Sequence, residues 1–525
     1  MDQPTKKIIE LTKELALKKF SNHEDFFKLI QKICSKKEIP LPRYSEIFAV
    51  YQKLKKQGKI KKNPFLEEIK KRPIRSLSGV AIVAVLTKPW PCPGQCFYCP
   101  LEKGVPKSYL SGEPAVERAK KLNFDPYLQA KKRIEILEKN NHPVDKIELI
   151  VIGGTWSYLP SKYQTWFIKR CFDGANFSSS KNLAEAQKKN ENSKHRIIGI
   201  TLETRPDYID EDELRRMRKL GCTRVEIGVQ STDNKILKKN KRGHGVEETI
   251  EATRLLKDAG FKICYHLMPG LYGSSPKKDL LVFKKIFSQP EFQPDMIKIY
   301  PCVVTKGSQL YQAYKKGEYK PYSDKQLINL LIKIKKIIPP YVRINRLIRD
   351  IPSWQIQGGS KVSNLRQTIQ EKAKEQGVFC QCIRCREIKT GKIKKQDLKL
   401  IKREYSASNG KEIFLSFENE KENKLIAFCR LRLPEKNNKF IFSVLKDSAL
   451  IRELHTYGQL VEIDKKNKKA SQHLGLGKKL IKEAEKIARK KGYHKMAIIA
   501  GIGVREYYRH LGYRLQNTYL IKLLK

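Results

Sequence analysis

The chain has 525 residues, a length that at roughly 150 residues per domain allows about three domains. Its composition is 40% hydrophobic and 31% charged, as in globular proteins, and no apolar stretch approaches the roughly 20 residues that a membrane span needs. Lys and Arg number 108 against 55 Asp and Glu, so the formal net charge of +53 favours a polyanionic partner, although a lysine bias of the whole proteome would look the same.

The sequence predicts a basic helical region at the N-terminus, over residues 1–72. Apolar residues recur at three-to-four spacing, for example at Ile8, Leu11 and Leu15, among many lysines. The same segment lacks the uninterrupted apolar run of a secretion signal, so we expect a cytoplasmic protein that does not associate with a membrane. Such a region either binds nucleic acid or packs as an extension of the next domain, and the sequence favours neither.

The sequence predicts an α/β domain over residues 73–340. Short apolar runs alternate with longer stretches of helical periodicity, an order that favours a parallel sheet. Because there are six such units rather than eight, we expect a partial, TIM-like (β/α)6 barrel. The predicted strands span 80–86, 147–152, 197–202, 225–229, 263–267 and 296–300, and the predicted helices include 126–140, 212–220, 246–259 and 277–287. The polar stretch 178–192 is predicted to be a surface loop.

Two further segments follow this domain. Residues 341–400 predict a connector that contains a cluster of cysteines. Residues 401–525 predict a second α/β domain, in which antiparallel strands precede a glycine turn and a helix. Its predicted strands span 413–417, 425–433, 451–457 and 496–500, its long helix ends at 491, and a short helix begins at 505.

Cys92, Cys96 and Cys99 directly follow the first predicted strand, where a parallel barrel places its catalytic loops. Three thiolates on one loop bind three irons of a 4Fe–4S cube and leave the fourth iron without a protein ligand, whereas an electron carrier normally supplies four cysteines. Tyr98, an aromatic residue before the last cysteine, is also typical of the radical SAM superfamily. In that superfamily the open iron chelates S-adenosylmethionine, which is cleaved to a 5'-deoxyadenosyl radical. The alternative is a zinc site with a distant fourth ligand.

Residues at the next two strand ends favour the radical SAM interpretation. Gly153, Gly154 and Thr155 follow the second predicted strand and match the superfamily's glycine turn beside the methionine part of S-adenosylmethionine. Glu203 and Arg205 follow the third strand, where a carboxylate and a guanidinium suit the two charges of an amino acid. Each motif alone is weak, but their order at successive strand ends is specific.

A coenzyme A cradle is predicted where the C-terminal helix begins. Gln472, Gly475 and Gly477 form the Gln-x-x-Gly-x-Gly signature of GNAT acetyltransferases, in which glycines let backbone amides approach a pyrophosphate at a helix N-terminus. Glycine turns also begin helices for structural reasons alone. Tyr507 and Tyr508 lie where these enzymes commonly place the acid for the departing thiolate, although paired tyrosines are usually packing residues.

Cys380, Cys382 and Cys385 stand too close together for a disulfide loop in a cytoplasmic chain. They suit a zinc site that staples the two domains, with redox chemistry or simple packing as the alternative. The sequence shows only three ligands and does not identify the fourth.

A radical SAM barrel, a cysteine connector and a GNAT domain in this order resemble the catalytic subunit of Elongator in its single-subunit archaeal or bacterial form, the family of tRNA uridine(34) acetyltransferases. The resemblance covers nearly all of residues 73–525, including 87–92, 144–146, 152–155, 203–207, 452–455 and 507–509. It implies that the anticodon stem-loop of a tRNA is bound, mostly through its phosphates. It also implies that the deoxyadenosyl radical removes a hydrogen from the methyl group of acetyl-CoA, that the carbon radical adds to the wobble uridine, and that thioester hydrolysis leaves 5-carboxymethyluridine.

The resemblance also implies which residues contact acetyl-CoA. They are Lys146, Glu453, Leu454, His455, Thr456, Leu476, Gly477, Lys478 and Tyr508, to which the cradle motif adds Gln472 and Gly475. Lys146 would otherwise be interpreted as a solvated lysine at the start of a strand. The N-terminal region matches the family only in its basic character.

Two other functions compete at this stage. A protein lysine acetyltransferase would use the GNAT domain alone beside a structural iron–sulfur cluster, but the positive charge of the chain would repel basic substrates. A radical SAM methylthiotransferase would be expected to carry further cluster cysteines, which the sequence does not show. The sequence does not reveal the electron donor, or whether the chain is a monomer or a homodimer.

Overall fold

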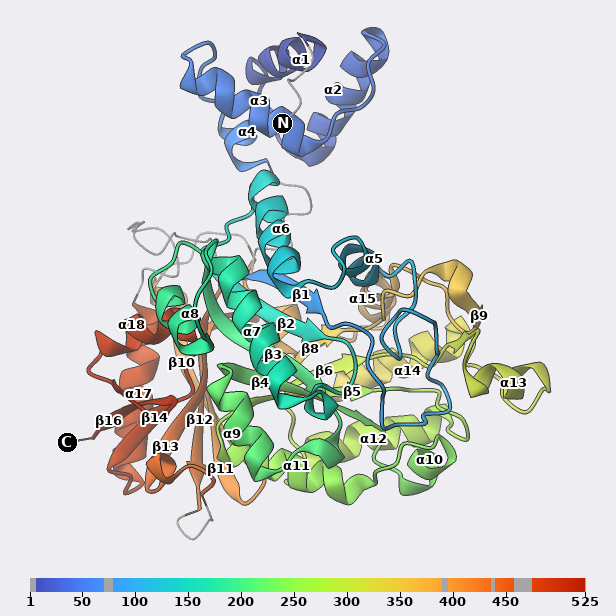
Figure 1. Cartoon of the computed structure of the whole chain (residues 1–525), viewed down its shortest axis with the longest axis vertical. Helices are drawn as coiled ribbons and strands as arrows, with labels where there is room; N and C mark the ends of the chain where they lie inside the picture. The colour runs from blue at the N-terminus through green and yellow to red at the C-terminus, as the bar shows by residue number, and fades with distance from the viewer. Residues whose placement is uncertain (1–5, 70–78, 390–394, 436–439, 458–474, 525) are drawn as a thin grey trace.

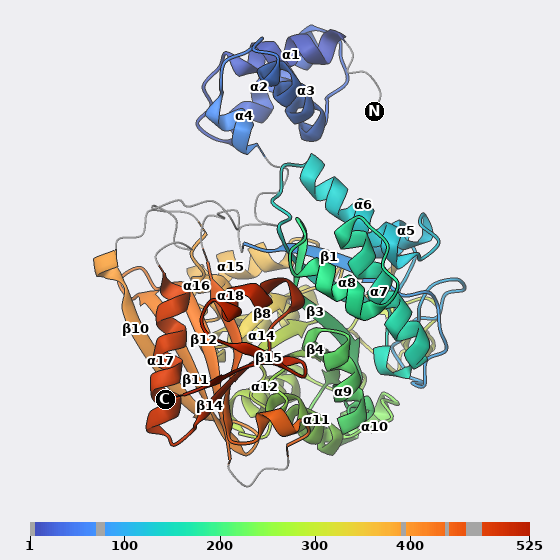
Figure 2. The same cartoon turned by 60° about the vertical axis from the view of Figure 1, so that its left-hand side comes forward.

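The computed structural model describes residues 6–69, 79–389, 395–435, 440–457 and 475–524. They form a small helical body at the N-terminus, a barrel-like sheet covered by helices, and a second sheet at the C-terminus (Figure 1). Figures 1 and 2 show the helical body standing apart from the other two, which lie side by side.

The N-terminal body consists of four helices, α1 (Lys6–Ala16), α2 (His23–Lys36), α3 (Tyr44–Lys56) and α4 (Pro64–Glu68). Its apolar positions form a core of their own, in which Leu11, Leu15 and Phe26 are fully buried. The predicted helical periodicity is therefore confirmed for this segment. Asn141 of the barrel domain reaches it by donating a hydrogen bond of 2.7 Å to the carbonyl oxygen of Glu67.

Seven parallel strands form the sheet of the barrel, in the order β1-β2-β3-β4-β5-β6-β8. The strands are β1 (Ala81–Leu86), β2 (Lys146–Ile152), β3 (Arg196–Thr204), β4 (Cys222–Gln230), β5 (Lys262–Leu267), β6 (Met296–Ile299) and β8 (Arg343–Arg346). The six predicted strands are all present, and the described sheet is open because β1 and β8 stand at its two ends. The strand that the sequence missed, β8, comes from the start of the predicted connector, where Arg-Ile-Asn-Arg is too polar to be recognised as a buried strand.

Helices cover the outside of this sheet. They are α5 (Pro114–Lys120), α6 (Pro126–Lys139), α7 (Ser161–Asn176), α8 (Leu183–Asn190), α9 (Glu211–Lys219), α10 (Asn234–Lys239), α11 (Val246–Asp258), α12 (Pro276–Ser288), α13 (Gln309–Lys315), α14 (Asp324–Ile337) and α15 (Leu365–Glu375). A two-stranded sheet of β7 (Val304–Thr305) and β9 (Ile356–Gly358) lies beside them. The predicted surface loop at 178–192 is wrong, because α8 occupies it. Asn182 caps that helix by accepting a hydrogen bond from the Glu185 amide at 2.9 Å, and Leu183 and Ala186 are buried.

The C-terminal sheet has the order β10-β11-β12-β13-β14-β16-β15. Its elements are β10 (Lys399–Ser406), β11 (Gly410–Asn419), β12 (Lys424–Pro434), β13 (Ser448–Thr456), β14 (Lys495–Ile498), β15 (Arg514–Gln516) and β16 (Tyr519–Leu523), with helices α16 (Ile383–Arg386), α17 (Leu476–Lys490) and α18 (Arg505–Arg509). Strands β10, β15 and β16 were not predicted. The parallel pair β13 and β14 is joined only over Ser448–Ile451 of β13, so the two strands separate beyond Ile451 and leave an opening in the sheet.

A buried ionic network joins the two sheets. Arg452 of β13 donates two hydrogen bonds, of 2.6 and 2.8 Å, to Asp295, which directly precedes β6. Arg432 of β12 pairs with Asp258 at the end of α11 at 2.5 Å, and Glu412 accepts from both arginines. All five side chains are buried. Because the partners precede the barrel strands, the C-terminal sheet packs against the amino ends of those strands, opposite the loop that carries Cys92, Cys96 and Cys99.

Candidate functional site

A cavity of about 1240 Å³ occupies the interior of the barrel and extends to the C-terminal sheet. Cys96, Gly154 and Glu203 line it near the carboxyl ends of the barrel strands, and Leu454 and Tyr508 line it from the C-terminal sheet. Barrel interiors are normally packed with branched aliphatic side chains. This interior is hollow instead, and residues of two domains line it. It is therefore the candidate site.

The loop after β1 brings its three cysteines to this cavity. Cys92, Cys96 and Cys99 line it, and none of them forms a disulfide. Burial, followed by the charge of Cys96, raises the pKa of the Cys99 thiol to about 11, so a nearby cation is needed for Cys99 to ionise at neutral pH. Arg242 supplies one positive charge, because it donates to Cys96 Sγ at 3.0 Å.

The spread of these sulfur atoms fits a cube better than a single ion. Zinc holds each sulfur at about 2.3 Å, so sulfurs that share one zinc lie within about 4.6 Å of one another. Cys92, Cys96 and Cys99 are not among the groups of described residues whose ligand atoms all lie within 4.8 Å. In a 4Fe–4S cube each cysteine binds a different iron, which permits the wider spacing.

The glycine turn after β2 lies beside this loop. Gly153 and Gly154 have φ angles of +138° and +104°, a region that L side chains rarely adopt. A Cβ on Gly153 would collide with Thr87 Oγ1, whereas one on Gly154 would only make an ordinary contact with the Lys107 carbonyl oxygen at 3.8 Å. Thr155 Oγ1 stands 4.0 Å from Cys92 Sγ, so the turn and the cysteine loop form one wall of the cavity.

Glu203 and Arg205, at the end of β3, both line the cavity. Arg205 is not a free cation, because it donates hydrogen bonds of 2.9 and 2.6 Å to the carboxylate of Asp207. Its guanidinium also packs against Gly94 of the cysteine loop, where a Cβ would lie 2.6 Å from Arg205 Nη1. Glu203 accepts a hydrogen bond of 3.1 Å from the Tyr109 hydroxyl.

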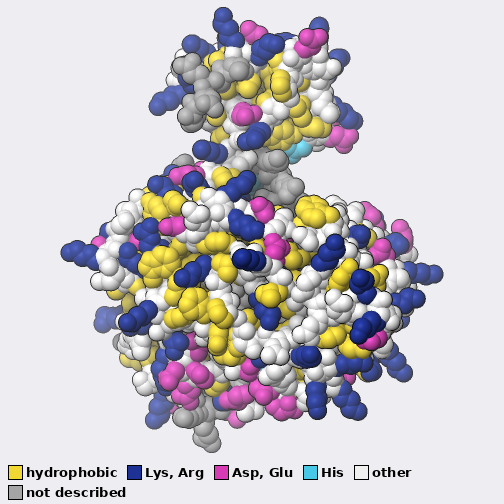
Figure 3. All heavy atoms as spheres, turned by 45° about the vertical axis from the view of Figure 1, so that its right-hand side comes forward, with side chains coloured by type: hydrophobic (Ala, Val, Ile, Leu, Met, Phe, Trp, Pro, Cys, Tyr) yellow, Lys and Arg dark blue, Asp and Glu magenta, His cyan; other side chains and the backbone are white. Residues whose placement is uncertain are grey.

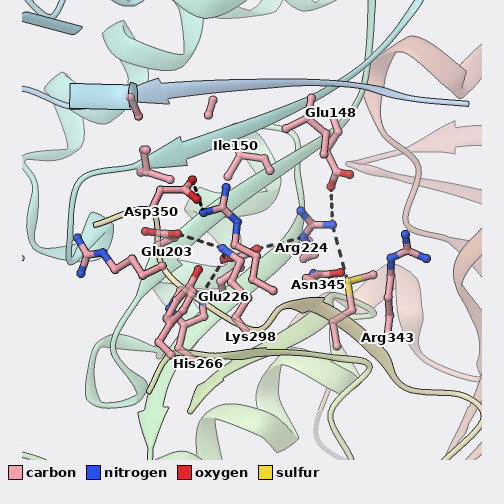
Figure 4. Close-up of a pocket in the computed structure, with 18 of the residues that line it drawn as sticks. Glu148, Ile150, Glu203, Arg224, Glu226, His266, Lys298, Arg343, Asn345 and Asp350 are labelled. Carbon is pink, nitrogen blue, oxygen red and sulfur yellow. Dashed lines mark hydrogen bonds and ion pairs between the residues drawn. The ribbon is translucent and has the colours of Figure 1, made fainter. Parts of the chain in front are cut away.

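Charged side chains that the sequence interpretation missed line the middle of the cavity (Figure 4). They include Glu148 on β2, Arg224 and Glu226 on β4, His266 on β5 and Lys298 on β6. A signal was present, because Glu226 and Lys298 each interrupt an apolar run, and a parallel strand covered on both faces is usually apolar throughout.

In the C-terminal domain, the expected residues gather at the N-terminus of α17. Gly475 precedes this helix with a φ of +67°. A Cβ on Gly477 would lie 3.1 Å from the Tyr507 hydroxyl, 3.7 Å from Leu454 Cδ2 and 4.0 Å from Thr456 Oγ1. The helix N-terminus thus faces the end of β13, beside the opening between β13 and β14. Leu476 is buried, Lys478 is exposed, and Gln472 lies outside the described residues.

The two tyrosines of α18 differ in position. Tyr508 is buried and lines the cavity, whereas Tyr507 is 38% exposed and stands at Gly477. Burial raises the pKa of both phenols, so both stay protonated at neutral pH. Either hydroxyl therefore carries the proton that an acid must donate.

Of the remaining residues expected to contact acetyl-CoA, Glu453 and His455 line the cavity, whereas Lys146 is not among its lining residues. Burial alone would raise the pKa of Glu453, but Lys262 and Arg430 outweigh it and lower the pKa, so Glu453 is an ion-paired carboxylate. The ring of His455 lies 4.2 Å from that of Tyr457. Burial lowers the pKa of Lys146, which begins β2 on the side of the barrel where the C-terminal sheet packs.

The second cysteine cluster has the geometry of a single-ion site. The sulfur atoms of Cys380, Cys382 and Cys385 all lie within 4.8 Å of one another, and no fourth His, Cys, Asp or Glu among the described residues completes the group. A hydrogen bond from Cys380 lowers the pKa of the Cys382 thiol. The cluster lies between the sheets: the Ile383 amide donates to Val342 at 3.0 Å, and the Ile388 amide donates to Leu425 of β12 at 3.0 Å.

Three protein families match successive parts of the chain. The radical SAM superfamily matches residues 92–282, the radical SAM C-terminal domain matches 294–375, and the GNAT acetyltransferase family matches 384–513. Radical SAM domains use a 4Fe–4S cluster and S-adenosylmethionine, and GNAT domains use acetyl-CoA. No helix in the described part of the chain has the length and apolar character of a membrane span.

Relatives cover most of the chain. A tRNA uridine(34) acetyltransferase from Methanocaldococcus infernus is 49% identical over 87% of this chain and 88% of its own length, and human Elongator complex protein 3 is 40% identical over 88% and 87%. The solved structure of an archaeal Elp3 from M. infernus with an N-terminal deletion has a TM-score of 0.75 and 46% identity, covering 85% of this chain and 100% of that chain. The lysine acetyltransferase alternative is not favoured by these matches. The chain belongs to the tRNA uridine(34) acetyltransferase family, which includes Elongator complex protein 3.

Proposed function

We propose that this chain converts the wobble uridine of a tRNA to 5-carboxymethyluridine, with acetyl-CoA as the carbon source and S-adenosylmethionine as the radical source. One observation carries the proposal: the cavity that Cys96 lines is also lined by Leu454 and Tyr508. A radical generator and a thioester site that share one cavity suit a reaction in which a radical must reach an acetyl group.

In the barrel, Cys92, Cys96 and Cys99 would hold the 4Fe–4S cluster, and Arg242 would balance part of its negative charge. Gly153, Gly154 and Thr155 would receive the methionine part of S-adenosylmethionine, together with Glu203 and Arg205. When bound, this pair supplies the 5'-deoxyadenosyl radical. Gly153 lets the turn pack closely on Thr87, where a Cβ would collide with the threonine hydroxyl, and this close turn would leave room for the cofactor beside the cysteine loop.

In the C-terminal domain, backbone amides of Leu476, Gly477 and Lys478 would bind the pyrophosphate of acetyl-CoA at the N-terminus of α17. Leu454 and Thr456 lie beside this helix end, and the opening between β13 and β14 would admit the pantetheine arm. Tyr508, protonated and facing the cavity, would donate a proton to the departing thiolate. Lys146, Glu453, His455, Gln472 and Gly475 complete the proposed contacts.

Phosphate binding would come from the basic surface. Figure 3 shows Lys and Arg side chains spread over both the N-terminal helices and the body below them. An anticodon stem-loop suits such a surface, and a loop base can be unstacked into a cavity at lower cost than a paired one. We assign residues 1–72 to tRNA binding, 73–340 to the radical SAM domain, 341–400 to the connector and 401–525 to the GNAT domain, with β8 of the connector completing the barrel sheet.

Zinc is the proposed ion at Cys380, Cys382 and Cys385. Three sulfurs within 4.8 Å agree with a zinc–sulfur distance of about 2.3 Å. Because the cluster lies between β8 and β12, the ion would fix the connector against both sheets.

The test is anaerobic reconstitution with iron and sulfide, followed by incubation with tRNA, acetyl-CoA and S-adenosylmethionine and mass spectrometry of the nucleosides. We expect 5-carboxymethyluridine. If S-adenosylmethionine is cleaved but no carboxymethyluridine forms, the proposal is wrong. Efficient acetylation of lysine peptides without any response to tRNA would instead support the competing function.

A further inference from the structure

The charged lining of the barrel interior is organised as ion pairs. Arg224 contacts Glu148 at 2.7 Å and Glu226 at 3.7 Å, and His266 Nε2 lies 2.8 Å from Glu226 Oε2. Lys298 lies between Glu226 and Glu203, in contact with the first and 3.4 Å from the second (Figure 4). Burying several charges in a barrel interior is costly unless they are paired, so a purely structural role would be filled more cheaply by aliphatic side chains.

Lys298 retains a donor for a ligand. Its ammonium group carries three N–H groups, and its hydrogen-bond partners among the described residues are the carboxylates of Glu203 and Glu226. Its side chain is buried, yet it lines the cavity. Burial alone would lower the pKa of Lys298, but Glu226 outweighs burial and raises the pKa, so the amine stays protonated.

The charge around Lys298 favours a neutral ligand. Lys298, Arg224 and Arg346 face the four carboxylates of Glu148, Glu203, Glu226 and Asp350, so this part of the cavity offers no excess of positive charge to a phosphate. A carbonyl oxygen is a neutral group that can accept a hydrogen bond from the remaining N–H of such an amine.

The cavity leads from Lys298 to the acetyltransferase domain. In Figure 4, Glu148 and Arg343 lie on the side of that domain, and Glu203, His266 and Asp350 lie farther from it. At the junction, Lys262 of β5 stands 3.9 Å from Glu453 of β13. The described structure therefore provides a polar route from the end of β13 to Lys298, and the carbonyl compound held at that end is the acyl thioester.

We propose that Lys298 binds the carbonyl oxygen of the acetyl group, which enters the barrel interior from the GNAT domain. The inference rests on the proposed function for the identity of the thioester. It adds Lys298 to the ligand-binding residues proposed above, which lie on the glycine turn, the cysteine loop and the N-terminus of α17. The acetyl group is then held beside the ion pairs that Lys298 makes with Glu203 and Glu226.

Calorimetric titration of the full-length, cluster-free protein with acetyl-CoA and with free coenzyme A tests this binding. The double variant Lys298→Met/Glu226→Gln removes the amine and the nearest carboxylate together, so that the fold does not keep an unpaired Glu226. Wild-type protein should bind acetyl-CoA more tightly than coenzyme A, and the double variant should lose roughly tenfold in that ratio. The matched control, Arg224→Met/Glu148→Gln, removes an ion pair of the same wall and should keep the wild-type ratio.

Isotope-edited infrared spectroscopy of bound acetyl-CoA labelled with ¹³C at the carbonyl gives a second readout. A hydrogen bond from Lys298 lowers the frequency of the thioester carbonyl in the wild type and in the control, and the double variant should return it toward the value in water-free solvent. If the double variant binds acetyl-CoA with the wild-type ratio and frequency, the inference is wrong. Loss of discrimination between uridine and cytidine with an unchanged ratio would equally overturn it, by assigning Lys298 to the base. The proposed function fails separately, if wild-type enzyme forms no carboxymethyluridine.

Discussion

Tyr508 of α18 and Cys96 of the loop after β1 line the same cavity. The domain of Tyr508 packs at the amino ends of the barrel strands, whereas the loop of Cys96 lies at their carboxyl ends. The hollow barrel interior explains how two chemistries on one chain can act on one substrate. A packed interior would have forced the acetyl group to travel around the outside of the sheet.

Replacing Cys96 by Ala should abolish cluster assembly and leave tRNA binding intact. Cys96 is buried and accepts a hydrogen bond from Arg242, whereas the Lys and Arg side chains that would bind phosphates are spread over the surface (Figure 3). Iron and sulfide should fall to background after reconstitution, with an unchanged dissociation constant for tRNA. Cys34→Ala, in the N-terminal helices, is the matched control and should keep full iron content. An equal loss of tRNA binding in Cys96→Ala would show that the loop has a structural role instead.

The second cysteine cluster should hold zinc independently of the iron. Cys385→Ser should lower the zinc content, measured by mass spectrometry of the metals, from one ion per chain toward zero and leave the iron unchanged. Cys99→Ser should do the reverse, because its sulfur belongs to the other cluster. A zinc content that is unaffected by Cys385→Ser would contradict the assignment.

Arg452→Met should destabilise the junction between the two sheets. The substitution leaves the buried carboxylates of Asp295 and Glu412 without a main partner, and breaking such a buried pair costs about 3–5 kcal/mol. Urea unfolding of the cluster-free protein measures this loss. The control is Arg215→Met, which removes partly exposed ion pairs with Glu211 and Asp212. Its free energy of unfolding should fall by at most about 1 kcal/mol. Similar losses in both variants would mean that the network does not join the sheets.

Glu213→Gln should change the pH dependence of stability. Burial raises the pKa of Glu213 in the folded chain to about 7, above its ordinary value of 4.5, so the folded state binds more protons than the unfolded state between these values. Wild-type stability therefore falls as the pH rises through this window, by up to about 3 kcal/mol. The glutamine variant should match the wild type near pH 4 and exceed it at pH 8.

Thermal unfolding at the two pH values measures the effect. Asp212→Asn, on the same helix but with an exposed side chain, is the control and should show no such difference. If Glu213→Gln gives the same shift in melting temperature at both pH values, Glu213 is already ionised in the folded protein.

Local patterns predicted the strands of the barrel because each is a short apolar run, and they predicted that the cysteine loop and the glycine turn follow strand ends. Strand β8 escaped prediction because its one buried apolar side chain, Ile344, stands in a polar tetrapeptide. Helix α8 escaped because its segment is polar, although Asn182 gives a local start signal by capping the helix. Strand β10 was missed because most of its side chains are exposed, as in an edge strand.

The candidate site was predictable where residues adjacent in sequence carry the chemistry, as in the cysteine loop and the helix N-terminus. It was not predictable where distant residues meet. Glu226 and Lys298 are on different strands, and only the curvature of the sheet brings them into contact. Arg205 lines the cavity as its proposed role requires, and its pairing with Asp207 was a further contact that the sequence interpretation did not include.

The central claim is that both halves of one chain act on one substrate in a shared cavity. Mixing two inactive variants tests it most directly: Cys96→Ala, which lacks the cluster, and Gly477→Val, which fills the space between the α17 N-terminus and Leu454. Each variant is incubated alone and in an equal mixture with tRNA, labelled acetyl-CoA and S-adenosylmethionine. We predict no labelled carboxymethyluridine in the mixture, because the acetyl group reaches the radical only within its own chain. Product from the mixture at a rate approaching that of the wild type would contradict the account.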